Sequence, residues 1–174
     1  MRQRVNIAQV TLGGRVVEAV GEFFDLYPCP DKALRGFLLY CRPVWKLLES
    51  KPLSSGDCVA FKGSEASFVI QLHSPAHIEG MTIEHIPYWD SPSGEITSAP
   101  KDFTMSAISS EGVEFFLDTF TYTIPGKTSQ MFKLKVPTQQ LFTKVKINFI
   151  TNHGHPHYTC VYRIKIHGMF VVLN

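Results

Sequence analysis

The 174-residue sequence predicts one all-β domain, an antiparallel β-sandwich. Apolar and polar residues alternate with period two in several short segments, turns containing Gly or Pro separate these segments, and helical periodicity is almost absent. Many short strands joined by turns are typical of a sandwich. The composition, with 44% hydrophobic and 18% charged residues, is that of a globular chain and excludes both intrinsic disorder and coiled coil.

The N-terminal third gives the weakest secondary-structure signal. A first strand is predicted over residues 12–19, entered through the glycine pair at 13–14. Residues 22–53 then carry clustered apolar side chains without a clean period, which fits a helix, a long hairpin, a flap or a strand pair packed on the core. An apolar segment of uncertain structure is a candidate interaction element.

The later segments show the alternation of half-buried strands. Phe68, Ile70 and Leu72 share one face of the first of them, and the same pattern recurs at Phe132, Leu134 and Val136, at Val145, Ile147 and Phe149, and at Tyr162, Ile164 and Ile166. Turn sequences at 91–94 and 125–127 separate the strands. Pro100 and Pro137 are expected to end strands or to lie at sheet edges.

Charge and local motifs exclude several classes of function. The net charge is only +2, so nucleic acid is not a predicted partner, and the lysines that alternate with apolar residues are expected to form solvated strand faces. No apolar run is long enough to cross a bilayer. The sequence has no GxSxG elbow, P-loop or HExxH motif, so no enzyme is predicted.

A histidine tract at His153, His155 and His157 is similar in spacing to a metal-binding sequence. Gly154 and Pro156 lie between the histidines and predict a turn, and no Cys or carboxylate ligand is adjacent in sequence. Loop histidines without a metal role are therefore the favoured interpretation.

Four cysteines allow three complete disulfide pairings, among which the spacing does not choose; they are Cys29, Cys41, Cys58 and Cys160. No CxxC motif is present, which disfavours a zinc ribbon or a thioredoxin-type site. Four reduced, buried thiols are the alternative. A bond between Cys58 and Cys160 would close a loop of about 100 residues, worth roughly 4–5 kcal/mol in chain entropy.

Four segments, in matching order and spacing, resemble the SUN domain family. Residues 56–63 (GDCVAFKG) resemble the family's GNCWAFxG. Residues 82–87 (TIEHIP) and 98–103 (SAPKDF) resemble its LEH[IV]P and SAPKDF segments. Residues 152–163 (NHGHPHYTCVYR) resemble NWGHPEYTC[IL]YR. Such a combination of motifs is specific to the family.

The resemblance covers residues 56–168 as the core of a single domain that extends over residues 1–174. Departures from the family pattern are Val59 and His153 in place of Trp and His157 in place of Glu. The family implies a jelly-roll-like β-sandwich with a projecting β-hairpin, the lid, expected here within residues 23–45; its expected ligand contacts are Phe37, Leu38, Leu39 and Tyr40.

The resemblance also implies a function. SUN proteins lie in the inner nuclear membrane with this domain in the perinuclear space, where it binds the C-terminal tails of KASH proteins of the outer membrane. The resulting LINC complex transmits cytoskeletal force to the nucleus in nuclear anchorage, nuclear migration and meiotic chromosome movement. The domain is expected to work as a homotrimer that binds three KASH tails, and this chain is expected to be a soluble luminal fragment without the membrane anchor.

The family's pocket for the KASH terminal carboxylate corresponds to His85, Ser98, Tyr158 and Tyr162. All four are hydrogen-bond donors that suit carboxylate capture better than catalysis. The resemblance also implies a Cys58–Cys160 disulfide, favoured by the oxidising perinuclear lumen. It leaves the pairing of Cys29 and Cys41 open.

A loop before Cys58 holds a potassium-like monovalent cation in the family through backbone carbonyls, which are nearly indifferent to side-chain identity. The corresponding positions here are Leu47, Ser50, Pro52, Asp57 and Tyr162. No other metal or cofactor is expected.

A second class of function is a carbohydrate-binding module, because lectin-like and discoidin-like sandwiches resemble the predicted fold. Tyr88 and Trp89, which are expected to be exposed, would stack on a sugar ring. The two functions differ in what they require of the structure. A peptide receptor requires one pocket that contains His85, Ser98, Tyr158 and Tyr162, whereas a sugar platform at residues 88–89 does not require such a pocket.

Overall fold

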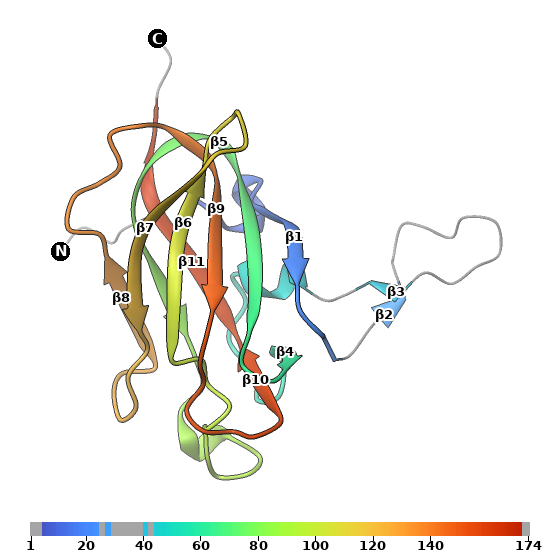
Figure 1. The fold of residues 1–174 in the computed structure, drawn as a ribbon. Coiled ribbons are helices and arrows are strands. Elements are labelled where there is room, and N and C mark those ends of the chain that lie inside the picture. The colour runs from blue at the N-terminus through green and yellow to red at the C-terminus, as the bar shows by residue number, and fades with distance from the viewer. Residues whose placement is uncertain (1–4, 25–26, 29–39, 42–43, 172–174) are drawn as a thin grey trace.

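The computed structural model describes residues 5–24, 27–28, 40–41 and 44–171, and regular structure in these ranges is mostly β (Figure 1). The elements run η1 (Val10–Leu12), β1 (Arg15–Val20), β2 (Tyr27–Pro28), β3 (Tyr40–Cys41), η2 (Val44–Leu48), β4 (Val59–Lys62), β5 (Ala66–Glu84), η3 (Tyr88–Asp90), β6 (Asp102–Ile108), β7 (Glu114–Thr121), β8 (Ser129–Lys133), β9 (Phe142–Phe149), β10 (Tyr158–Val161) and β11 (Arg163–Phe170). Within the described ranges the helices are 3₁₀ segments of three to five residues, and none is long and apolar enough to cross a membrane.

The sandwich is organised around β5, which is 19 residues long and belongs to both layers. Its first part pairs with β1 and β9, and β6 and β7 continue that layer beyond β9. Its second part pairs with β11 and β8. The ladder to β9 shifts between Gln71 and Ala76, where the strand passes from one layer to the other, as strands at the corners of sandwiches do. All pairings are antiparallel, as the sequence predicted.

The core lies between the layers and contains most of the side chains that the alternation selected. Val136 is an exception: β8 ends at Lys133, and Val136, which was expected to continue the buried face, is 65% exposed. Val145, Ile147 and Phe149 of β9 are fully buried, whereas lysines alternate with them. The Phe149 ring contacts those of Phe68 and Phe103 at centroid distances of 6.0 and 5.8 Å. Complete burial of each such side chain stabilises the fold by roughly 1.5–3 kcal/mol, so the aromatic cluster is a large part of what holds the two layers together.

The first strand begins later than predicted. It runs from Arg15 to Val20, and Leu12, expected to start it, instead ends η1. Gly13 adopts a left-handed φ of 86° as the C-cap of this turn, which a glycine tolerates without strain. At Gly14 a Cβ atom would lie 1.9 Å from the carbonyl oxygen of Ala8, so the backbones pack too closely here for a side chain. The glycine pair is thus a turn before the strand and not part of it.

The ambiguous segment after β1 contains two kinds of structure. η2 places Leu47 and Leu48 in the core, both fully buried. β2 and β3 pair antiparallel, Tyr27 with Cys41, and project away from the sandwich in Figure 1, within the range predicted for the lid. Phe37, Leu38 and Leu39 fall outside the described residues, so their predicted contacts stay predictions, and Tyr40 is described only as part of the β3 backbone.

Candidate functional site

A cavity of about 470 Å³ opens beside β10, and we call it the hydroxyl cavity because Ser98, Tyr158 and Tyr162 line it. Three of the four residues of the predicted carboxylate pocket therefore converge on one site. Phe24 adds apolar surface to its wall. The site thus combines hydroxyl donors with apolar surface, as a site for a peptide terminus requires.

Backbone pairing positions the donors. The N–H of Cys160 in β10 donates to the carbonyl of Ser98 at 2.8 Å, which holds the 91–98 loop against the strand. Side chains alternate along a strand, so Tyr158 and Cys160 of β10 face the same side. Tyr162, between β10 and β11, lines the cavity with them.

Tyr162 is 95% buried and its hydroxyl oxygen accepts the Gly56 N–H at 3.1 Å, which leaves the hydroxyl proton available for a ligand. Burial raises the pKa of Tyr162, with a smaller opposing contribution from the Gly56 hydrogen bond, so the side chain stays a neutral donor. Tyr158 is 37% exposed, and its ring lies 3.9 Å from that of His155 and 6.4 Å from that of Phe24, centroid to centroid.

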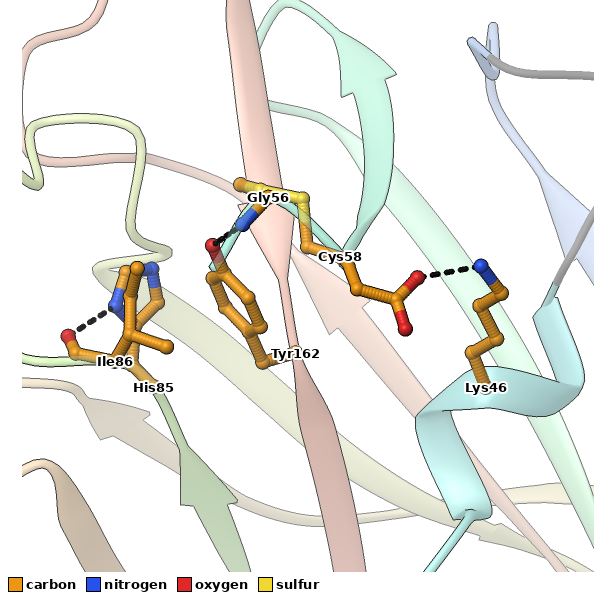
Figure 2. Close-up of a disulfide and its surroundings, with 8 residues drawn as sticks. Lys46, Gly56, Cys58, His85, Ile86 and Tyr162 are labelled. Atoms are coloured by element: carbon orange, nitrogen blue, oxygen red, sulfur yellow. Dashed lines mark hydrogen bonds and ion pairs between the residues drawn. A yellow bond between two sulfur atoms is a disulfide. The ribbon is translucent and has the colours of Figure 1, made fainter. Parts of the chain in front are cut away.

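His85, the fourth predicted residue, does not line the cavity. Its ring is 96% buried and packs edge-to-face on Tyr162 at 4.8 Å, on the side away from the disulfide (Figure 2). Its Nδ1–H donates to the carbonyl of Ile86 at 2.9 Å, and Nε2 has no hydrogen-bond partner among the described residues. Burial lowers the pKa of His85 most, and the nearby His153 lowers it further, against the Ile86 bond. In this structure a neutral His85 orients Tyr162 and does not donate into the cavity.

His155 lines the cavity, although the sequence reasoning placed it only in the histidine tract. Its Nδ1 accepts the backbone N–H groups of His157 and Tyr158, each at 3.2 Å. Because Nδ1 is an acceptor, the ring proton is on Nε2, which is then a donor. The sequence cue for this placement was the turn expected at Gly154, which directs the chain back toward β10. In the structure Gly154 adopts a φ of 103°.

His153 lies in different surroundings from His155 and His157, whose ring centroids are 5.9 Å apart. His153 Nε2 lies 2.7 Å from the carbonyl oxygen of Tyr122, while His155 binds the backbone of its own turn. No group of three metal-ligating side chains occurs among the described residues.

Burial raises the pKa of Tyr122 to about 12, and its hydroxyl donates to the carbonyl of Thr128 at 2.8 Å.

A disulfide joins Cys58, directly before β4, to Cys160 of its partner strand β10, with the Cα atoms 5.6 Å apart (Figure 2). Both cysteines line the hydroxyl cavity, so the bond forms part of its wall. The side chains of Cys29 and Cys41 are outside what the structure describes.

The predicted cation loop borders a second cavity of about 300 Å³, which we call the lysine cavity because Lys46 lines it. Of the five predicted carbonyl contributors, Pro52, Asp57 and Tyr162 also line it, whereas Leu47 and Ser50 do not. The Lys46 ammonium lies 2.5 Å from a carboxylate oxygen of Asp57 (Figure 2). A cationic side chain therefore already occupies the neighbourhood expected for the ion.

Comparison with solved structures gives similar folds. The family 32 carbohydrate-binding module of Streptococcus pneumoniae EndoD is similar with a TM-score of 0.67 and 15% identity, covering 94% of this chain and 99% of that one. Allantoicase from Saccharomyces cerevisiae gives a TM-score of 0.64 at 17% identity, covering 95% of this chain and 43% of that one. These similarities show a shared β-sandwich fold.

Comparison with protein sequences gives much closer relatives. Human SUN domain-containing protein 1 is 40% identical over 139 residues, and human SUN domain-containing protein 3 is 43% identical over 115 residues. The alignments cover 75% and 65% of this chain but only 18% and 32% of those proteins. The Sad1/UNC-like C-terminal family model matches residues 42–170. With the motifs of β4, β5 and β10 in the family's order, this chain belongs to the Sad1/UNC-like, or SUN, domain family.

Proposed function

We propose that the hydroxyl cavity binds the C-terminal carboxylate of a KASH-protein tail and that the domain is a non-enzymatic receptor. The observation that carries the proposal is the convergence of the Ser98, Tyr158 and Tyr162 hydroxyls on one cavity, with the His155 Nε2–H as a fourth donor. A carboxylate that loses water on binding needs several hydrogen bonds, each worth roughly 1.5–3 kcal/mol to a charged group.

The tail upstream of the carboxylate is proposed to bind as an added strand. Residues 22–24 run along β4, with Phe24 N–H donating to the Ala60 carbonyl at 3.0 Å and Lys62 N–H to the Glu22 carbonyl at 2.7 Å. This segment leads from the cavity wall at Phe24 toward the projecting β2–β3 pair. A peptide lying between the two would gain main-chain hydrogen bonds from the hairpin and side-chain contacts from the wall.

The proposed setting follows from the family. The full-length protein is proposed to be anchored in the inner nuclear membrane, with this domain in the perinuclear space. There it would assemble as a homotrimer with three KASH tails and tether the inner to the outer nuclear membrane. The Cys58–Cys160 disulfide supports an oxidising compartment such as this one.

The test compares synthetic KASH C-terminal peptides that end in a free carboxylate or in an amide. The amide is expected to bind the full chain at least about tenfold more weakly, because it loses the charge that the donors stabilise. Glu95, an exposed carboxylate in the cavity lining, provides a second arm. Glu95→Gln is expected to tighten binding of the free acid by up to about fivefold and to leave the amide unchanged. Equal affinity of the two peptides would contradict the proposal.

One observation favours a second candidate, sugar binding. Tyr88 and Trp89 are 59% and 71% exposed and contact each other edge-to-face at 5.1 Å. The perpendicular rings do not form a flat stacking platform, which favours the peptide receptor. A glycan array that gives binding abolished by Trp89→Ala, with KASH-peptide affinity unchanged, would establish the sugar site.

A further inference from the structure

Two positive side chains from neighbouring elements contact the loop over residues 49–57. Lys46, on η2, extends across the lysine cavity to Asp57, and its side chain is only 22% exposed. An ammonium group is a compact monovalent cation with three N–H donors, so it provides charge and hydrogen bonds at one point, as a bound ion would. The ion pair joins η2, which is anchored in the core by Leu47 and Leu48, to the far end of the loop.

A second cation fixes the middle of the same loop. The Arg163 guanidinium, on β11, donates to the backbone carbonyl of Lys51 and to a Glu84 carboxylate oxygen at 3.3 Å. Arg163 is 92% buried and Glu84 also accepts Lys165 at 2.6 Å, so the guanidinium is held in place from the sheet side. The carbonyl of Lys51, which lies between the predicted contributors Ser50 and Pro52, therefore already accepts an N–H donor.

These contacts do not fit the monovalent metal ion that the family implies. Pro52, Asp57 and Tyr162 share the lysine cavity with both Lys46 and Arg163, so an ion beside their carbonyls would lie close to two positive side chains. Like charges in a partly desolvated site repel strongly. Glu49 and Asp57 add carboxylates to the same lining, but Asp57 is already paired with Lys46, and the remaining predicted carbonyl contributors, Leu47 and Ser50, do not line this cavity.

We infer that the Lys46 ammonium is the resident cation of the 49–57 loop and that this domain keeps the loop in place without a bound potassium or sodium ion. Gly56 and Cys58, on either side of Asp57, line the hydroxyl cavity. Because Asp57 lies between these two residues, its ion pair with Lys46 holds this part of the cavity wall in place. The inference concerns the loop itself and holds whether or not the hydroxyl cavity binds a peptide.

The first test is thermal unfolding of the full chain in KCl, NaCl and choline chloride at equal ionic strength. The wild-type melting temperature is expected to agree within about 1 °C in all three salts. Lys46→Gln and Asp57→Asn, which remove the two ends of the same pair, are each expected to lower it by about 2–4 °C, and the double variant by no more than either alone. Lys51→Gln is the matched control, because it removes the same charge from the same cavity lining, and no ion pair of its side chain occurs among the described contacts.

Rubidium, a heavier stand-in for potassium, gives the structural readout. Crystals grown in RbCl are expected to give no anomalous peak in the lysine cavity of the wild type. Three results would overturn the inference: a rubidium ion on the carbonyls of Pro52 and Asp57, a saturable rise of several degrees in the wild-type melting temperature in KCl over choline, or equal melting temperatures for Lys46→Gln and Lys51→Gln.

Discussion

Tyr158→Phe removes one hydroxyl from the hydroxyl cavity and leaves the ring. No hydrogen bond from the Tyr158 hydroxyl to another described residue is found, and the ring contacts with His155 and Phe24 do not involve the oxygen. The substitution is therefore expected to change the free energy of unfolding by no more than about 0.5 kcal/mol. Any larger effect on ligand affinity then reports on the hydroxyl itself.

The magnitude follows from the charge of the ligand. A hydrogen bond to a carboxylate contributes roughly 1.5–3 kcal/mol, and 1.4 kcal/mol corresponds to a factor of ten in affinity. Tyr158→Phe should thus weaken binding of a KASH peptide with a free C-terminus by about tenfold or more. Against the amidated peptide the same substitution should cost only about 0.5–1.5 kcal/mol, the usual value for a neutral hydrogen bond.

The assay is a double-mutant cycle by isothermal titration calorimetry, in which the wild-type domain and the Tyr158→Phe variant are each titrated with the carboxylate and the amide peptide. Coupling between the two changes is expected because both alter one contact. Tyr88→Phe, which removes an exposed hydroxyl outside the cavity lining, is the control and should not couple. Additive effects of Tyr158→Phe and amidation, with the fold intact, would place the carboxylate elsewhere and refute the reasoning.

Three further predictions concern the fold. Replacing Cys58 and Cys160 together by Ala should cost about 4–5 kcal/mol in urea unfolding, since the bond closes a loop of 102 residues; a loss below about 1 kcal/mol would contradict the chain-entropy argument. Burial holds the pKa of His85 below its ordinary value of 6.5, so below pH 6.5 the unfolded chain binds a proton that the folded chain does not. Stability should therefore fall as the pH drops from about 6.5 toward the lowered pKa, and His85→Gln should flatten that part of the curve measured by denaturant titration. Gly14→Ala should destabilise the domain by about 1–3 kcal/mol because its Cβ would meet the Ala8 carbonyl; a neutral effect in thermal melts would show that the turn relaxes.

Most of the fold could be predicted from the sequence, because the residues that alternate with period two in the sequence also alternate between buried and more exposed positions in the strands. Ile147 is buried and its neighbours on β9 are less so, as expected for period two between two layers. The start of β1 could not be predicted, because Leu12 is a residue type that fits a strand. In the structure Leu12 belongs to the turn η1, which ends at Gly13 with a left-handed φ. Propensity gives no information about the close approach of Gly14 to Ala8, which depends on tertiary packing.

The site could be predicted in part. Tyr158 and Tyr162 were identified through the family motif, and both line the cavity, Tyr158 from β10 and Tyr162 from the position directly after it. The orientation of His85 could not be predicted, because it depends on the path of the backbone after β5 and on the Ile86 carbonyl. The Lys46–Asp57 pair was also missed, because its partners lie 11 residues apart, one on η2 and one at the end of the loop that follows it, and no periodic pattern relates them.

The disulfide has a mechanical consequence. When the chain is pulled from its ends, the covalent bridge between Cys58 and Cys160 carries the tension past every residue between them. At roughly 3.3–3.6 Å per extended residue, about 350 Å of contour length is removed from the path of the load. Only the polypeptide before Cys58 and after Cys160 can then lengthen, and load reaches the bridged strands only through the ladders that join β1 and β11 to β5.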